Sequence, residues 1–197
     1  MLSSLSAATR SRAEVKEELL PAFFVLNRFV QRSPQDPCAV HLLGLLCERL
    51  DQLEESEQWI SRAIVLLEAA YEECEDPLVE RQFTIAHSNL ARLKLSLANF
   101  SSALESYGTI LGLLPEGSVE DDAETKVLRV QALFGSGLAQ FKLGDLQSAM
   151  ITFQNALDTC GEDYLLRAHV TVLLAQCMWA IWTEEFKESA KALLLDR

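Results

Sequence analysis

Three histidines and five cysteines are the side chains best able to bind a metal or attack a substrate. The histidines are His41, His87 and His169, and the cysteines are at positions 38, 47, 74, 160 and 177. Neither His-Glu-x-x-His nor Cys-x-x-Cys occurs, so no motif has the spacing of a zinc site. We expect His41 and His87 to lie on a helix surface or groove, and the odd cysteine count to reflect scattered thiols in a reducing compartment. The sequence therefore predicts no metal site.

A second candidate for chemistry is the Gly135-Ser136-Gly137 segment. Its glycines do not flank the serine at the offset of a nucleophile elbow, and no strand precedes it. Gln140 stands where a dinucleotide fingerprint needs its third glycine. Carboxylates abound, but on helix surfaces they lack the burial or charge partners that acid–base catalysis requires. We therefore expect a protein that is not an enzyme and that holds no cofactor.

The elements that would position these residues follow from a pattern that recurs at Ala22, Ser56, Ala103 and Ala149. In the clearest copy a first helix, A, carries Gly137, a Gly-Asp turn follows at 144–145, and a second helix, B, carries Ala149, Phe153 and Ala156. Small residues let two helix backbones approach closely, and glycine and aspartate suit the turn. This is the pattern of a tetratricopeptide unit, a helix pair that repeats about every 34 residues.

The spacing between copies is uneven. Ala22 and Ser56 are 34 residues apart, but Ser56 and Ala103 are 47 apart, and Ala103 and Ala149 are 46 apart. The excess falls at 69–77 and 116–122, where we expect extended helices and a short acidic loop. The last copy, through Cys177, Phe186, Ser189 and Leu193, is the weakest. The predicted fold is all-α, a single tetratricopeptide solenoid segment over 1–197 with several extended helices, and its repeat units are 6–36, 37–78, 79–119, 125–161 and 164–197.

Charge and hydropathy restrict the partners. The formal net charge is −12, which opposes direct binding of this segment to nucleic acid phosphates. The longest apolar run, 170–182, is too short to cross a membrane. The first dozen residues read as a helix or tail left where a longer chain was cut. Three leucines at 193–195 would expose an apolar face at the end, so we expect a fragment of a larger repeat protein.

What remains as a candidate site is the groove lined by the A helices. The positions that correspond to the carboxylate clamp of chaperone-tail binders in this fold include His41, Leu45, Ser88 and Arg92, so the lysine and asparagine clamp is absent. The last two units offer an apolar, aromatic surface instead. The predicted protein-binding residues are Phe134, Leu138, Phe141, Leu174, Met178, Ile181 and Trp182. The alternative is that these residues pack against the next helix, or against the next turn of a longer superhelix.

Beyond the generic repeat, a further likeness is carried by the segments 26–34, 45–50, 64–68, 80–83, 91–100, 137–141 and 153–157. It covers roughly Leu20 to Asp196 and rests on the order and spacing of these segments. In these features the chain resembles the tetratricopeptide scaffold subunits of the fungal superkiller (Ski) complex, in the C-terminal repeat arm.

The resemblance implies a non-catalytic scaffold in the cytoplasm. In that family the subunit joins a DExH-box RNA helicase to WD-repeat subunits, and the assembly feeds messenger RNA to the RNA exosome for 3′-to-5′ decay. Two other interpretations remain open. The chain could be a stand-alone adaptor that binds an apolar peptide in its groove, or an accessory domain of an enzyme.

Overall fold

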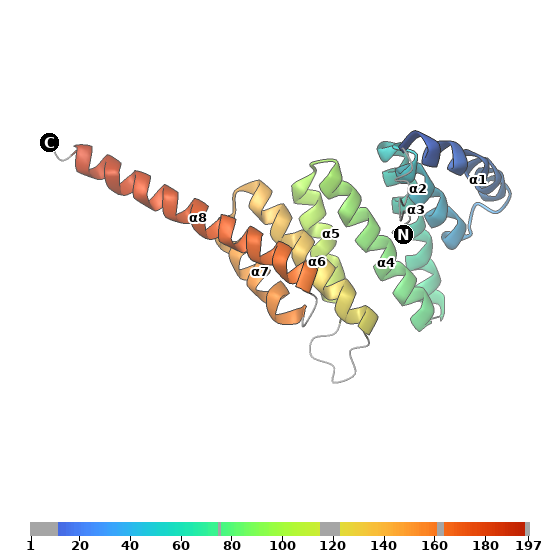
Figure 1. Cartoon of the computed structure of the whole chain (residues 1–197). Coiled ribbons are helices and arrows are strands. Elements are labelled where there is room, and N and C mark those ends of the chain that lie inside the picture. Colours follow the sequence, from blue (N-terminus) through green and yellow to red (C-terminus); the bar gives the residue numbers. More distant parts are fainter. Residues whose placement is uncertain (1–11, 75, 115–122, 161–163, 196–197) are drawn as a thin grey trace, which may run out of the picture. The chain divides into compact units, whose positions relative to one another are not determined.

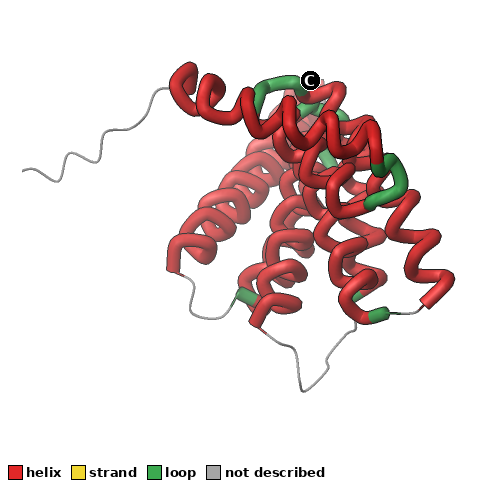
Figure 2. The backbone as a smooth tube through the Cα atoms, turned by 90° about the vertical axis from the view of Figure 1, so that its right-hand side faces the viewer, coloured by secondary structure: helices red, strands yellow, loops and turns green. Residues whose placement is uncertain are grey.

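The computed structural model describes residues 12–74, 76–114, 123–160 and 164–195. Within these ranges every regular element is an α-helix, as Figures 1 and 2 show. The helices are α1 (Arg12–Arg32), α2 (Pro37–Arg49), α3 (Leu53–Cys74), α4 (Pro77–Ser96), α5 (Phe100–Leu113), α6 (Ala123–Leu143), α7 (Leu146–Thr159) and α8 (Tyr164–Leu195). They form two compact units, which meet in the sequence at Glu80 and Arg81 within the first turn of α4.

The first unit is built on α1, α2 and α3. Asp36 caps α2 by accepting a hydrogen bond on its Oδ1 from the Ala39 N–H at 3.0 Å, and Pro37 occupies the first helical turn, where it loses no hydrogen bond. Apolar residues at helical spacing then meet between the three helices. The buried members of this core are Val30, Ala39, Val40, Leu43 and Ala63.

The second unit contains two core clusters, and each is shared by three consecutive helices. Ala91 of α4, Tyr107 of α5 and Ala132 of α6 belong to the first cluster. Phe153 of α7 and Val170 of α8 belong to the second, against which Phe134, Leu138 and other side chains of α6 pack. Within this compact unit, each A–B helix pair thus packs against the A helix of the following repeat, as in a tetratricopeptide array.

The turn of the clearest repeat copy is confirmed. Gly144 has a φ of +86°, a left-handed conformation that glycine adopts without strain. Asp145 then caps α7 by accepting a hydrogen bond from the Ser148 N–H at 3.1 Å. Hydrogen bonds from the Ser148 side chain and from its backbone N–H hold the pKa of the Asp145 carboxyl below its usual value. The Gly-Asp pair therefore ends one helix and starts the next.

The expected helix extensions are also present. Helices α3, α4 and α6 have 22, 20 and 21 residues, whereas α5 and α7 have 14 each. Pro77, at the end of the range 69–77, lies at the start of α4. The acidic loop at 116–122 and residues 1–11 fall outside the described residues.

Two expectations were wrong. The last unit, 164–197, was expected to hold a helix pair, but Tyr164–Leu195 is one helix of 32 residues. No glycine or proline occurs in that range, so nothing in the sequence breaks the backbone. Ala22 was expected to sit in a close helix contact like Ala103 and Ala149, which are 0% exposed, yet Ala22 is exposed.

Tyr107 gives the fold a predicted alkaline limit. Its side chain is 4% exposed between α5 and the flanking helices, and burial raises the pKa of the phenol to about 12. The unfolded chain, with a phenol pKa near 10, loses that proton first, so stability should be intact below about pH 10 and fall as the pH rises towards 12. Urea denaturation at stepped alkaline pH measures this. Tyr107→Phe should flatten the profile over this range, and an unchanged profile would assign the loss to other groups.

Candidate protein-binding site

The α6 half of the predicted patch is part of the protein core. Phe134, Leu138 and Phe141 are half-buried and pack against the cluster formed by Phe153, Val170 and their neighbours. The Phe134 and Phe153 ring centroids are 6.3 Å apart with the ring planes tilted by 54°. These three side chains therefore support the alternative that the stripe packs against neighbouring helices.

The α8 half of the patch is divided. Leu174 is half-buried against the same cluster, and Ile181 is half-buried. Met178 and Trp182 are 57% and 54% exposed. Leu174, Met178 and Trp182 follow one another at intervals of four residues, so they share one face of α8. The outer part of this face remains a candidate for binding a protein.

Trp179 belongs with these exposed residues, although the sequence analysis did not select it. It is 66% exposed, and its ring centroid lies 5.3 Å from that of Trp182. The signal that could have found it is the three-residue spacing from Trp182, which places both rings on adjacent turns. We call Met178, Trp179 and Trp182 the α8 aromatic face. Tryptophan and methionine are enriched at the centres of protein interfaces.

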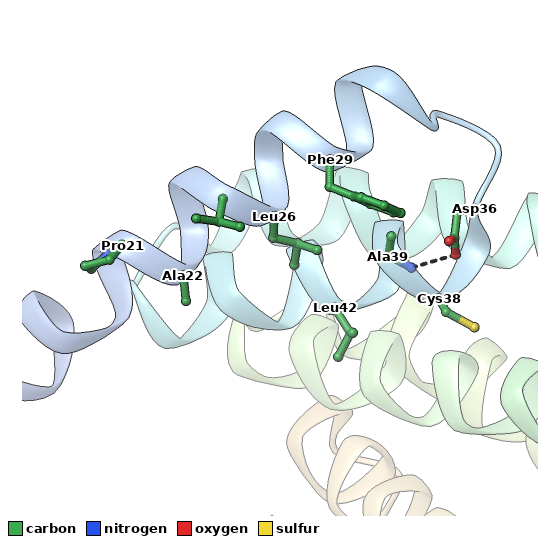
Figure 3. Close-up of a pocket in the computed structure, with 9 residues that line it drawn as sticks. Pro21, Ala22, Leu26, Phe29, Asp36, Cys38, Ala39 and Leu42 are labelled. Carbon is green, nitrogen blue, oxygen red and sulfur yellow. Dashed lines mark hydrogen bonds between the residues drawn. The ribbon is translucent and has the colours of Figure 1, made fainter.

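A second apolar surface lies between α1 and α2, and nothing in the sequence analysis selected it. A pocket of about 700 Å³ opens there, with Asp36 at one margin. Figure 3 shows Ala22, Leu26 and Phe29 of α1 on the side of that helix that faces α2. We call this the α1–α2 groove; it is lined by Pro21, Ala22, Val25, Leu26, Phe29, Asp36, Cys38, Ala39 and Leu42.

The residues with potential for chemistry are dispersed. His41 and His87 are half-buried, and burial lowers the pKa of both imidazoles. The His87 ring stacks edge-on against Phe83, with 4.5 Å between centroids. In the described ranges no three His, Cys, Asp or Glu side chains come together as metal ligands. The described histidines are therefore not arranged with other side chains as a metal site.

The cysteines likewise form no reactive centre among the described residues. Cys47 and Cys177 are buried, and burial raises the pKa of both thiols. A raised pKa reduces the thiolate fraction on which nucleophilic attack depends. Cys38 and Cys74 are exposed, and Cys38 lines the α1–α2 groove.

Polar contacts join α4 and α5 beside the apolar cluster that the two helices share. The Lys94 ammonium donates to the Ser106 Oγ at 3.2 Å, and that hydroxyl donates to the Ser102 carbonyl at 3.0 Å. Arg92, at a position that the clamp would use, is exposed.

None of the helices in the described part of the chain has the combined length and apolarity needed to span a bilayer.

Comparison with known proteins points to one kind of relative. No protein-family model matches the chain. Superkiller protein 3 of Schizosaccharomyces pombe is 28% identical over 179 residues, which is 91% of this chain. Superkiller protein 3 of Saccharomyces cerevisiae is 29% identical over 177 residues, which is 90% of this chain. The chain spans about 12% of the length of these relatives.

Solved structures give the fold. MamA of Desulfovibrio magneticus, residues 41 to the end, aligns with a TM-score of 0.53 at 14% identity, over 92% of this chain and 98% of that protein. A double mutant of the same protein aligns with a TM-score of 0.50 at 12% identity, over 88% of this chain and 98% of the other. The chain is thus an all-α helical repeat of the tetratricopeptide type, and in sequence it resembles Superkiller protein 3.

Proposed function

We propose that this chain is a non-catalytic protein-interaction scaffold, a segment of a Ski-complex tetratricopeptide subunit that supports exosome-dependent 3′-to-5′ decay of messenger RNA in the cytoplasm. The observation that carries the proposal is the similarity to Superkiller protein 3 along about nine-tenths of the chain in two yeasts. A helical repeat supports it, because repeated helix pairs create extended surfaces for other proteins. The partners are a DExH-box RNA helicase and WD-repeat proteins, and catalysis belongs to the helicase and the exosome.

The surface we assign to partner contact is the α8 aromatic face. Its three side chains are each more than half exposed, and all lie on one helix of the second unit. Large apolar side chains exposed together favour burial against another protein. Phe134, Leu138, Phe141, Leu174 and Ile181 then serve as the support on which this face rests.

Affinity purification of the full-length tagged protein from cytosol tests the proposal. We expect a DExH-box helicase and WD-repeat proteins to copurify, and replacement of Met178, Trp179 and Trp182 by alanine to reduce their recovery. The matched control is Ile151→Ala, because Ile151 is a large apolar residue that is 61% exposed and belongs to α7 rather than α8. Recovery of chaperones alone would refute the scaffold proposal, and equal recovery with both variants would remove the α8 aromatic face from it.

A stand-alone peptide adaptor is the second candidate, and the same exposed aromatic residues favour it. It differs in one measurable respect. An adaptor would bind a short linear apolar peptide with residues 1–197 alone, and would lose that binding in the triple alanine variant while remaining folded.

A further inference from the structure

The α1–α2 groove can be compared directly with two equivalent seams in the second unit. In the repeat pattern Ala22 corresponds to Ala103 and Ala149, Leu26 to Tyr107 and Phe153, and Phe29 to Ile110 and Ala156. The three residues on α5 and the three on α7 are all between 0% and 4% exposed. On α1, Ala22 is exposed and Phe29 is 46% exposed. This face of helix B is therefore covered on α5 and α7, as it is on α3, where Ser56, Ile60 and Ala63 are 0% exposed, and it is open on α1.

The cover in the two closed seams is the preceding A helix. Helix α4 supplies Ala91 and Leu95 to the cluster shared by α5 and α6. Helix α6 supplies Leu138 to the cluster shared by α7 and α8, and its Gly137 lies so close that an added Cβ would come within 2.6 Å of the Phe153 ring. Gly137 of α6 thus lies close to α7 with Leu138 next to it, and α4 has a buried small residue, Ala91, at the corresponding position with Leu90 next to it.

The chain's own first residues do not have this chemistry. Gly44, Ala91 and Gly137 each stand twelve residues before Ser56, Ala103 and Ala149 respectively. Twelve residues before Ala22 the residue is Arg10. A guanidinium at a contact that admits only glycine or alanine would be desolvated without a partner, which is costly.

We propose that the α1–α2 groove binds the A helix of an adjoining tetratricopeptide unit, an amphipathic helix that places a glycine or alanine, with a leucine next to it in the sequence, at the contact with Leu26. Val25, Phe29 and Leu42, which are 71%, 46% and 53% exposed, would be covered by that helix. Insertion of an amphipathic helix into an apolar groove is driven by burial of such side chains. This inference concerns a different surface from the α8 aromatic face and stands whether or not the proposed function is correct.

The test uses a peptide that copies Pro77–Leu97, because this segment contains an A helix with the Leu90-Ala91 step. Fluorescence anisotropy of the labelled peptide against the whole 197-residue chain measures its dissociation constant. We expect saturable binding that weakens at least about tenfold in Val25→Asp, since the variant places a carboxylate where the bound helix would bury an apolar side chain. Val65→Asp is the matched control, because Val65 is 64% exposed on α3 outside the groove.

A substituted peptide distinguishes specific binding in the groove from nonspecific apolar binding. The Ala91→Arg peptide places at the contact the residue found at Arg10, and it should bind at least about tenfold more weakly. Equal binding of the two peptides, equal effects of the two aspartate variants, or no binding would overturn the proposal. A gain in affinity on deleting residues 1–11 would identify that segment as the occupant instead. Self-association in sedimentation that Val25→Asp abolishes would identify a second copy.

Discussion

Phe153→Ala should lower the free energy of unfolding by about 3–5 kcal/mol, the largest single effect we expect in this chain. The ring is 0% exposed and lies in the cluster shared by α6, α7 and α8. Replacement removes most of the side chain from that cluster. Gly137, against which the ring lies, has no side chain that could fill the space, so the site closes only in part. Urea denaturation followed by far-UV circular dichroism measures the change.

Ile151→Ala provides the control on the same helix. Ile151 is 61% exposed on α7, so its truncation should change stability by less than about 0.5 kcal/mol. Comparable losses in the two variants would mean that α7 does not pack through the face assigned here.

Gly44→Ala should destabilise the first unit by about 1–3 kcal/mol, although alanine is the better helix former by about 1 kcal/mol. An added Cβ would lie 2.6 Å from the Ile60 Cγ1 and 3.1 Å from the Ile60 backbone nitrogen. A side chain can rotate away from such a contact, but a backbone atom on a packed helix can move only if α2 and α3 separate. The same denaturation measurement detects the effect.

Gly108→Ala is the corresponding control. Gly108 lies inside α5, and an added Cβ there would meet nothing within 4 Å. Alanine should therefore stabilise the chain by about 0.4–1 kcal/mol. Opposite signs for the two glycines are the expected result, and a gain in stability for Gly44→Ala would disprove the close approach of α2 to α3.

The sequence was most informative where a local rule and a packing rule agreed. Around Gly144 and Asp145 the turn residues and the alanines of the next helix both indicate a helix pair, and α6 and α7 form one. In α8 the two rules conflict. Small and apolar residues continue the repeat through Phe186 and Leu193, but no turn residue interrupts the backbone, and the intrinsic continuity of the helix prevails.

The candidate site was less predictable, because a stripe of apolar side chains at helical spacing looks the same whether it faces a groove or a neighbouring helix. Phe134 and Met178 occupy such stripes on α6 and α8, and only the packing of α7 and α8 separates the half-buried phenylalanine from the exposed methionine. The sequence did not predict the exposure of Ala22 for a related reason. A pattern on one helix does not report whether its partner is present.

The unbroken course of α8 has a mechanical meaning. At about 1.5 Å per residue its 32 residues extend about 48 Å. Among the side chains that the structure describes, the buried ones that pack with α7, Val170 and Cys177, lie in the first half of α8, and Figure 1 shows the second half running beyond α6 and α7. A rod anchored at one end acts as a lever. A small tilt at the α7 seam becomes a large sweep at the far end, and a load applied at the tip is transmitted to Phe153 and its neighbours.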